Sequence, residues 1–353
     1  MSQLEAPGRP ALDALERYRE AIVAALRAAV ERGAGERADV PPYTLMRYHL
    51  GWEDAQGRPL ESRGGKLLRP SLLLLCCEAS SGDWPNALPA AAAVELLHNF
   101  TLLHDDVEDA SEQRHGRDTV WRVWGQAEAI NAGDGMFGLA HLTLLGLSER
   151  GHPAERVLEA VRLLDEATLL LCEGQHRDLR NEDGRPIGSA DYLAMIDGKT
   201  AALLGACCAI GALLGGAGQA AVRGLHEFGR RLGLAFQVRD DLLGCWGDAS
   251  ETGKSSGDDI RAGKQSYPIV IALERASDQQ RAQLRAVLGR ANSSDAELSQ
   301  ARALLERLGA RRDGEQAASE HAEAAIQALR GISLGDQRIE LEALARFAAE
   351  RNA

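Results

Sequence analysis

Apolar residues recur every three or four positions along most of this 353-residue chain. The pattern is plain in segments 11–33, 296–310 and 320–332, and no long alternation typical of β-strands appears. An α-helix turns by about 100° per residue, so this spacing gathers apolar side chains on one helix face. Only short Gly-, Pro- and Asp-rich turns interrupt it. The sequence therefore predicts one all-α domain over residues 1–353, with ten or more helices.

The composition excludes one class of partner. The formal net charge is −12, and no basic domain stands apart from the rest, so nucleic acid is not expected to bind. The chain has six cysteines and no C-x-x-C pair, which favours free, buried thiols in a reducing compartment. The first ten residues contain no apolar run of signal-peptide type, so we expect a cytoplasmic protein.

One uncharged stretch, residues 201–222, is long enough to cross a bilayer. It consists mostly of alanine and glycine, with few large apolar side chains. Small residues of this kind allow helices to pack closely inside a protein. We therefore expect one or two buried helices here and no membrane span.

An acidic cluster ends an apolar helix predicted over residues 91–109. Asp105 and Asp109 are four residues apart and share a helix face, and stepping back along that face gives Thr101 and His98. Two carboxylates one turn apart suit a hard divalent cation with oxygen ligands. The alternative is a solvated helix end, although acids interact unfavourably with the C-terminus of the helix dipole.

A second acidic pair, Asp240 and Asp241, lies in another apolar helical segment 135 residues after Asp105. Gln237 precedes Asp241 by one turn, and Gly244 follows Asp240 by one turn without a third carboxylate. Only folding could bring the two pairs together. If the two helix faces meet, they could hold several Mg²⁺ ions between them.

Basic residues stand beside glycine turns and close to the acidic clusters. Each alone is best read as a solvated surface charge, but together they resemble clamps for a phosphate-bearing anion. A diphosphate held by cations on one side and by metal ions on the other would explain how an acidic protein binds an anion. The polar residues in these positions are Lys66, Arg69, Arg114, His115, Lys199, Thr200, Lys254 and Lys264.

A series of motifs in fixed order makes the chain resemble the trans-isoprenyl diphosphate synthases, the polyprenyl synthetase family. The resemblance covers residues 60–275 and implies an isoprenoid synthase-type helical bundle around a central active-site cavity, usually in a homodimer. A single DDxxD is a weak signal, but the full series is specific. The motifs are GGKLLRP, ELLHNFTLLHDDVED, INAGD, EGQHRDL, MIDGKTAAL and FQVRDDLLGCWGDASETGKSSGDDIRAGKQS.

The resemblance implies Mg²⁺-dependent condensation of isopentenyl diphosphate with allylic diphosphates such as dimethylallyl, geranyl or farnesyl diphosphate. Three Mg²⁺ ions are implied, with Asp105, Asp109 and Asp240 as ligands and with Asp106 and Asp241 in support. Further residues are implied as substrate contacts. Arg114, Lys199, Lys254 and Gln237 would hold the allylic diphosphate, and Lys66, Arg69 and His98 would hold isopentenyl diphosphate.

Two positions depart from the family pattern. His115 stands where a second arginine usually follows the first motif, so weaker and pH-dependent affinity for isopentenyl diphosphate is expected. Gly244 stands where many members have a third aspartate in the second motif. Because that aspartate usually has a supporting role, we expect no loss of activity.

The product length is expected to depend on the residues just before the first motif. Phe100 lies five residues before Asp105, Thr101 lies four before it, and the motif has no insertion. In the family, one aromatic residue at this place without an insertion goes with geranylgeranyl diphosphate, which is the product expected here. Farnesyl diphosphate and longer products remain the alternatives.

Three other functions compete with this interpretation. A class I terpene cyclase shares the fold, but its second metal motif usually mixes Asn, Ser and Glu, unlike RDDLLGCWGD. A non-catalytic subunit of a heteromeric synthase usually lacks one aspartate motif, whereas both are present here. A purely structural helical protein would leave the whole series of motifs without a purpose.

Overall fold

The computed structural model describes residues 14–60, 65–80, 82–181, 186–247, 257–290 and 292–351. Its described part is mainly α-helical, as the sequence predicts, with one two-stranded hairpin and one isolated β-bridge between Glu53 and Pro59. The α-helices are α2 (Arg19–Ala34), α3 (Tyr43–His49), α4 (Leu68–Ala79), α5 (Leu88–Glu108), α6 (Val120–Trp124), α7 (Gln126–Leu145), α8 (Ala154–Asn181), α9 (Ser189–Ile196), α10 (Ala202–Leu214), α11 (Gln219–Trp246), α13 (Asp258–Ala262), α14 (Tyr267–Arg275), α15 (Asp278–Arg285), α16 (Asp295–Arg307), α17 (Ala310–Ala328) and α18 (Gln337–Glu350).

Short elements join these helices. A π-helical turn, η4 (Asp197–Ala201), lies between α9 and α10. The hairpin pairs β1 (Gln113–Arg114) with β2 (Arg117–Asp118) directly after α5. The 3-10 turns are η1 (Gly35–Arg37), η2 (Trp84–Ala87) and η3 (Gly146–Arg150).

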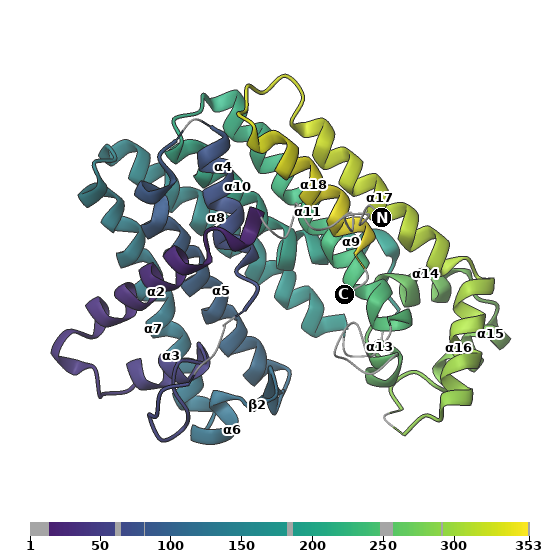
Figure 1. Cartoon of the computed structure of the whole chain (residues 1–353). Coiled ribbons are helices and arrows are strands. Elements are labelled where there is room, and N and C mark those ends of the chain that lie inside the picture. The colour runs from purple at the N-terminus through teal and green to yellow at the C-terminus, as the bar shows by residue number, and fades with distance from the viewer. Residues whose placement is uncertain are drawn as a thin grey trace, which may run out of the picture.

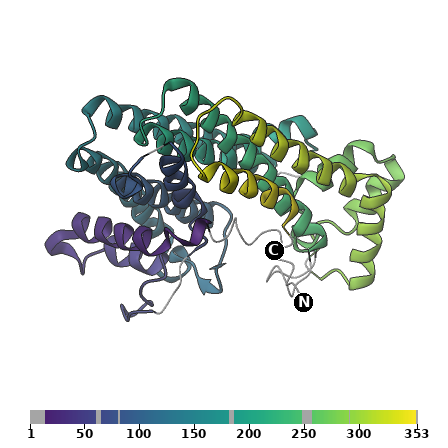
Figure 2. The ribbon, with the colours of Figure 1, turned by 45° about the horizontal axis from the view of Figure 1, so that its top comes forward.

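Helix α11 runs through the middle of the molecule and packs against α10, α17 and α18 (Figure 1). Helix α5 packs mainly against α7, and α4 packs against α10. In the tilted view of Figure 2, α17 and α18 lie along one side of α11. The two long helices α5 and α11, which carry the acidic motifs, thus belong to one bundle.

Local sequence signals explain where several helices begin. Pro89 occupies the first turn of α5, where its missing N–H breaks no helical hydrogen bond. The alanines at positions 90–93 are fully buried and allow close packing around this turn. Helices α15 and α16 each begin with a capping box, at Ser277 and Ser294.

The prediction of a buried helix is confirmed for residues 202–214, whereas residues 215–222 form a partly exposed turn and the start of α11. Helix α10 is almost wholly buried. Ser189–Leu214 is the one described segment with the length and hydropathy of a membrane span, and 67% of its 18-residue apolar part is buried. Glycines in α10 and α11 allow the backbones of neighbouring helices to come close together. A Cβ on Gly211 would lie 2.1 Å from the Leu73 carbonyl oxygen of α4, and one on Gly229 of α11 would lie 2.4 Å from the Leu204 carbonyl oxygen.

All six cysteines are free, and five of them are buried. Cys76 and Cys77 of α4 and Cys207 and Cys208 of α10 lie in the main apolar core. Cys172 is the exception to the predicted burial, because it is exposed on α8.

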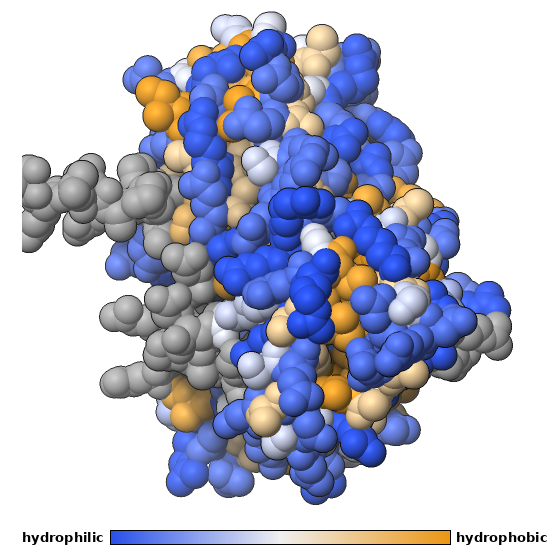
Figure 3. Space-filling view, turned by 90° about the vertical axis from the view of Figure 1, so that its right-hand side faces the viewer, coloured by the Kyte–Doolittle hydropathy of each residue, from blue (hydrophilic) through white to orange (hydrophobic). Residues whose placement is uncertain are grey.

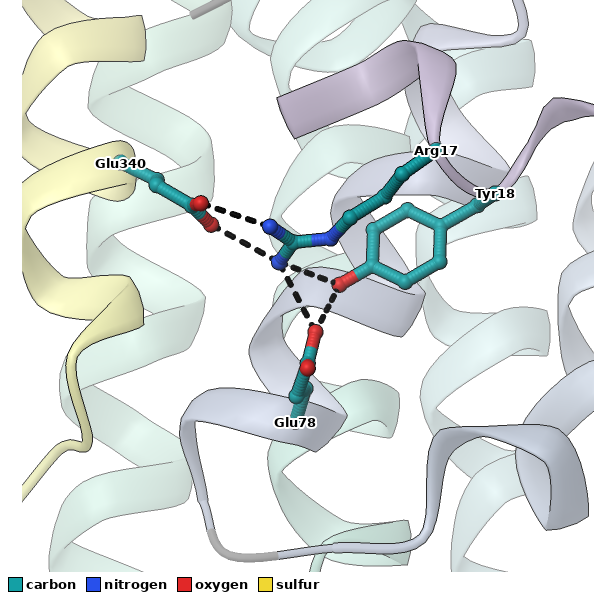
Figure 4. A network of polar contacts seen from close by, with 4 residues as sticks. All are labelled: Arg17, Tyr18, Glu78 and Glu340. Carbon is teal, nitrogen blue, oxygen red and sulfur yellow. Dashed lines mark hydrogen bonds and ion pairs between the residues drawn. The ribbon is translucent and has the colours of Figure 1, made fainter. Parts of the chain in front are cut away.

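A polar network ties the start of the described chain to α4 and α18 (Figure 4). Arg17 donates hydrogen bonds to Glu340 at 2.6 Å and to Glu78 at 2.8 Å, and the Tyr18 hydroxyl also donates to Glu78. Burial and the Glu78 carboxylate raise the pKa of Tyr18, so it remains a donor. These contacts fix α18 against the bundle.

The face at the α14–α17 end of the molecule is mostly hydrophilic (Figure 3). Apolar residues form a narrow seam between the hydrophilic ones on this face. Beneath it, α9, α13, α14, α16 and α17 enclose a second apolar cluster, which also includes residues of α11.

Gly211→Ala is expected to destabilise the protein by about 1–3 kcal/mol, because the added methyl group would force α10 away from the α4 backbone. Urea unfolding followed by circular dichroism measures this change. Gly138→Ala in α7 is the matched control: nothing lies within 4 Å of its new Cβ, and a gain of about 0.5–1 kcal/mol is expected from the removed glycine. Equal stability of the two variants would contradict the packing argument.

Candidate active site

The first acidic motif lies at the C-terminal end of α5, and its aspartates differ in environment. Asp106 is buried, and the Arg114 guanidinium donates to both of its carboxylate oxygens, at 2.9 and 3.1 Å. Asp105 is half-buried and Asp109 is exposed. Burial raises the pKa of Asp105 to about 6, with Lys199 opposing the rise and Asp109 adding to it. Both oxygens of Asp106 are therefore used in hydrogen bonds inside the protein, whereas the carboxylates of Asp105 and Asp109 remain accessible.

The second acidic motif, on α11, repeats this division. Asp241 is buried; it accepts hydrogen bonds from the Tyr192 hydroxyl, from the Tyr267 backbone N–H at 3.1 Å and from the Gln237 amide at 3.2 Å. Burial raises its pKa to about 6. Asp240 is partly exposed and forms an ion pair with Arg351, the residue that follows α18.

The π-helical turn η4 presents Lys199 to the acidic groups. The Lys199 ammonium donates to Asp178 of α8 at 2.6 Å. The turn lies against α8, because a Cβ on Gly174 would be only 2.2 Å from the Lys199 backbone nitrogen. Glycine at this position therefore permits the contact between α8 and η4.

The two acidic motifs face one site, because Asp106 of the first and Asp240 of the second line the same cavity. Burial lowers the pKa of Lys199, but the carboxylates of Asp105, Asp178 and Asp109 outweigh it and raise the pKa overall. Burial likewise lowers the pKa of Lys264, and Asp241, Asp259, Asp178 and Asp240 reverse that effect. Asp178 lines one cavity with Lys199, Lys264 and Asp109 of the first motif.

A cavity of about 570 Å³, hereafter the basic cavity, lies on one side of this site. It lies between α4, α5, the hairpin and the end of α18. The predicted residues in its lining are Lys66, Arg69, His98, Asp106, Arg114, His115, Thr200 and Asp240. Arg117 and Arg351 also line it, and side chains with cationic groups such as these suit a strongly charged anion.

Arg69 and His98 are in direct contact at the base of the basic cavity. An Arg69 Nη lies 3.1 Å from His98 Nε2, and burial together with Arg69 and Arg114 lowers the pKa of His98 well below its ordinary value. His98 is therefore neutral near pH 7 and accepts this hydrogen bond. Glu95, one turn before His98, is buried, and burial raises the pKa of this acid above its ordinary value.

A second cavity, of about 720 Å³, lies on the other side of η4. Asp109, Asp178, Lys199 and Lys264 line it, together with Arg285 of α15. Thr200 and Lys199 are neighbours in sequence but line different cavities. The Thr200 hydroxyl donates to the Gln237 side chain at 3.0 Å, which links η4 to the second acidic motif.

The predicted chain-length residues lie on a different part of α5. The Phe100 ring packs against His104, with ring centroids 4.8 Å apart, and against Phe137 of α7 at 5.3 Å. Thr101 is buried, and its hydroxyl donates to the His98 carbonyl at 2.8 Å. Thr101 therefore satisfies its own helix, and neither Phe100 nor Thr101 lines the two cavities.

The space beside Gly244 is filled by a carboxylate from α13. A Cβ added to Gly244 would lie 2.4 Å from the carboxylate carbon of Asp259. The same carboxylate acts on Asp241 and Lys264. An acidic group thus lies next to the position from which the third aspartate of the motif is missing.

The donor set fits a hard divalent cation, although no cage is preformed. Within the described ranges, no three acidic, histidine or cysteine side chains lie close enough to hold a metal ion together. Mg²⁺ is usually held by one or two carboxylates and completed by substrate phosphates and water. The accessible carboxylates of Asp105, Asp109 and Asp240 suit this mode of Mg²⁺ coordination.

The structure places Arg114 in the basic cavity, bound to Asp106, and away from the second cavity where Lys199 lies. Lys254 lies outside the described residues. The sequence interpretation gave no role to Asp178, Tyr192, Asp259 or Arg351. Asp178 and Asp259 lie within quoted motifs, whereas no local signal links Tyr192 or Arg351 to aspartates that are 49 and 111 residues away.

Residues 56–305 match the family model of the polyprenyl synthetases. Two similar proteins come from Mycobacterium tuberculosis strain H37Rv. A (2E,6E)-farnesyl diphosphate synthase is 38% identical over 91% of this chain and 89% of its own length. A geranylgeranyl diphosphate synthase is 41% identical over 82% of this chain and 81% of its own length.

Solved structures agree with this likeness. The polyprenyl synthetase from Streptomyces coelicolor A3(2) matches with a TM-score of 0.86 and 40% identity, over 95% of this chain and 98% of that one. A Corynebacterium glutamicum geranylgeranyl pyrophosphate synthase, complexed with isoprenyl diphosphate and magnesium, matches with a TM-score of 0.82 and 28% identity, over 96% and 99%. The chain therefore belongs to the polyprenyl synthetase family and is a prenyltransferase that elongates trans-prenyl diphosphates.

Proposed function

We propose that this enzyme condenses isopentenyl diphosphate with allylic diphosphates and releases geranylgeranyl diphosphate. The observation that carries the proposal is the cationic basic cavity directly beside two facing aspartate motifs. Two anionic substrates need two cationic sites, and η4 separates two cavities that each contain basic residues.

Isopentenyl diphosphate is assigned to the basic cavity. Lys66, Arg69 and His115 supply donors there, and neutral His98 helps to fix Arg69. The allylic diphosphate is assigned to the side of Lys199 and Lys264, with Thr200 and Gln237 between the two sites. Lys254, which lies outside the described residues, is kept as a further contact that the family resemblance implies. Arg114 lies on the isopentenyl side, so its reach toward the allylic diphosphate would require it to leave Asp106.

We assign Asp105, Asp109 and Asp240 as the ligands of three Mg²⁺ ions, because their carboxylates are accessible. The related C. glutamicum enzyme was solved with isoprenyl diphosphate and magnesium, which supports this choice. When bound, the metal neutralises the diphosphate and makes it a competent leaving group. Asp106 and Asp241 support the ligands from buried positions.

The reaction needs no protein nucleophile. The C–O bond of the allylic diphosphate breaks, and its electrons leave with the diphosphate, while Lys199 and Lys264 stabilise the growing negative charge. The double bond of isopentenyl diphosphate attacks the allylic cation and forms a new C–C bond. The proton lost from isopentenyl diphosphate passes to the released diphosphate. Apolar walls of the bundle keep water from the cation.

We propose that the growing prenyl chain is stopped by the aromatic pair Phe100 and Phe137. These two rings pack against each other where α5 meets α7. The similar proteins include both a farnesyl and a geranylgeranyl diphosphate synthase, at comparable identity. Farnesyl or longer products are therefore the second candidates for this same reaction.

We further propose a cytoplasmic homodimer that forms through α7 and α8. Free cysteines are typical of a reducing compartment. Helices α7 and α8 pack side by side and expose large apolar residues that a second copy of this chain could cover. These residues are Ile130, Phe137, Leu142, Leu145, Leu158, Leu169 and Leu170.

The function is tested with purified protein, isopentenyl diphosphate, Mg²⁺ and, separately, dimethylallyl, geranyl and farnesyl diphosphates. Mass spectrometry of the products is expected to show geranylgeranyl diphosphate as the longest main product. EDTA should abolish turnover. A cyclic product without use of isopentenyl diphosphate would indicate a terpene cyclase, and no turnover with any primer would indicate a non-catalytic subunit.

Phe100→Ala is expected to shift the products beyond geranylgeranyl diphosphate, because it removes the ring that meets α7 below the first motif. Mass spectrometry of the chain lengths gives the readout. Phe347→Ala, which truncates a partly buried phenylalanine on α18, is the control and should leave the products unchanged. An unchanged distribution in Phe100→Ala would remove this residue as the chain-length barrier.

His115→Arg is expected to lower the KM for isopentenyl diphosphate by about fivefold to tenfold, because a permanent charge replaces an imidazole in the lining of the basic cavity. Initial rates at a saturating allylic primer measure the change. Gln113→Arg adds the same charge to the same hairpin outside that lining and should change KM little. A KM that rises or stays constant in His115→Arg counts against the assignment.

Leu158→Glu combined with Leu169→Glu is expected to give monomers, because both side chains are more than half exposed on the apolar face, at 66% and 67%. Multi-angle light scattering should find twice 37.9 kDa for the wild type and 37.9 kDa for the variant. Ile339→Glu alters an apolar residue on α18 that is 73% exposed, and it should remain dimeric. A wild type that is already monomeric would rule out the dimer.

A further inference from the structure

Asp240 forms its ion pair with a side chain that lies 111 residues further along the chain. A terminal nitrogen of Arg351 donates to Asp240 Oδ1. The two partners differ sharply in exposure: the Arg351 side chain is 3% exposed and that of Asp240 is 44% exposed. Both residues line the basic cavity, but the guanidinium is almost wholly buried, whereas the carboxylate is partly exposed.

Contacts from α11 fix Arg351 in this place. Its guanidinium lies over the Phe236 ring, 3.9 Å from the ring centroid, and donates to the Phe236 carbonyl at 3.4 Å. Arg239 in turn donates to the Arg351 carbonyl at 2.6 Å. The end of α18 is therefore attached to the same turn of α11 that carries Asp240.

The rest of α18 is held in the same way. Arg17 bonds Glu340 in its first turn, and Arg338 donates to the Leu329 carbonyl at 2.7 Å and to the Ile332 carbonyl at 2.8 Å. Arg351 is consequently a rigid partner for Asp240. A rigid donor restricts the rotation of a carboxylate far more than a mobile surface arginine would.

The contact uses one oxygen of Asp240. Oδ1 accepts from Arg351, and Oδ2 stands outside this hydrogen bond. Asp106 in the first motif differs, because Arg114 bonds both of its oxygens and the carboxylate is buried. Asp240 therefore combines a fixed orientation with an available oxygen.

We propose that Arg351 is a positioning residue for Asp240: it binds Oδ1 and thereby directs Oδ2 toward the divalent cation and diphosphate. The inference rests on the proposed function, in which Asp240 is a metal ligand. Groups that hydrogen-bond a metal-binding carboxylate set its orientation, and their loss typically weakens metal affinity by about 10–100-fold. Arg351 would thus act on the metal through Asp240 without touching the metal.

The test measures Mn²⁺ binding by electron paramagnetic resonance of the free ion, in the presence of inorganic pyrophosphate and without prenyl substrates. Arg351→Gln is expected to weaken one class of Mn²⁺ site by about tenfold. Arg351→Lys, which keeps a charge and a donor, should recover part of the affinity. Arg346→Gln removes an arginine that is 52% exposed on the same helix, and it should bind Mn²⁺ like the wild type.

The proposal is overturned if Arg351→Gln remains folded, by circular dichroism, and binds Mn²⁺ as tightly as the wild type or more tightly. Tighter binding would mean that Arg351 competes with the cation for Asp240. Asp240→Asn tests the metal-ligand role of Asp240 apart from the positioning role of Arg351, since it should abolish the Mn²⁺ site that Arg351→Gln weakens. If Asp240→Asn leaves Mn²⁺ binding intact, the assignment of Asp240 as a ligand fails with the inference, while chain elongation by the wild type tests the reaction independently.

Discussion

The site depends on the neutralisation of carboxylates by cations that the protein itself supplies. Asp106 is paired with Arg114, Asp178 with Lys199 and Asp240 with Arg351, and each pair joins separate segments of the chain. Acidic groups this close would otherwise repel one another and push their helices apart. The internal cations allow α5, α8 and α11 to present acids toward a common space before any metal or substrate arrives.

Close helix packing makes this arrangement stiff. Glycines at 174, 211 and 229 let backbones approach to distances that no side chain would allow. The helices that carry the acidic motifs are buried along much of their length, so the polar groups sit on fixed supports. Precise placement of this kind is what stabilisation of a developing charge requires.

The helical class and the limits of α5 to within a few residues could be foreseen from the sequence, because periodicity is a local property. The meeting of the two aspartate motifs, 135 residues apart, was expected from the family resemblance alone. The sequence did not indicate that Thr101 bonds its own helix or that Cys172 is exposed. Nor did it indicate Tyr192 and Arg351 as partners of Asp241 and Asp240. Those pairings depend on where distant helices cross, and no spacing rule encodes such crossings.

The π-helical turn η4 sets the register of the helix that follows it. Successive helical side chains point in directions about 100° apart, and here Lys199 and Thr200 line the two neighbouring cavities. Loss of one residue within Asp197–Ala201 would rotate the following helix by about 100° and exchange which side chain each cavity receives. The number of residues in this turn is therefore constrained as tightly as their chemistry. Insertions or deletions there should be rarer in evolution than substitutions.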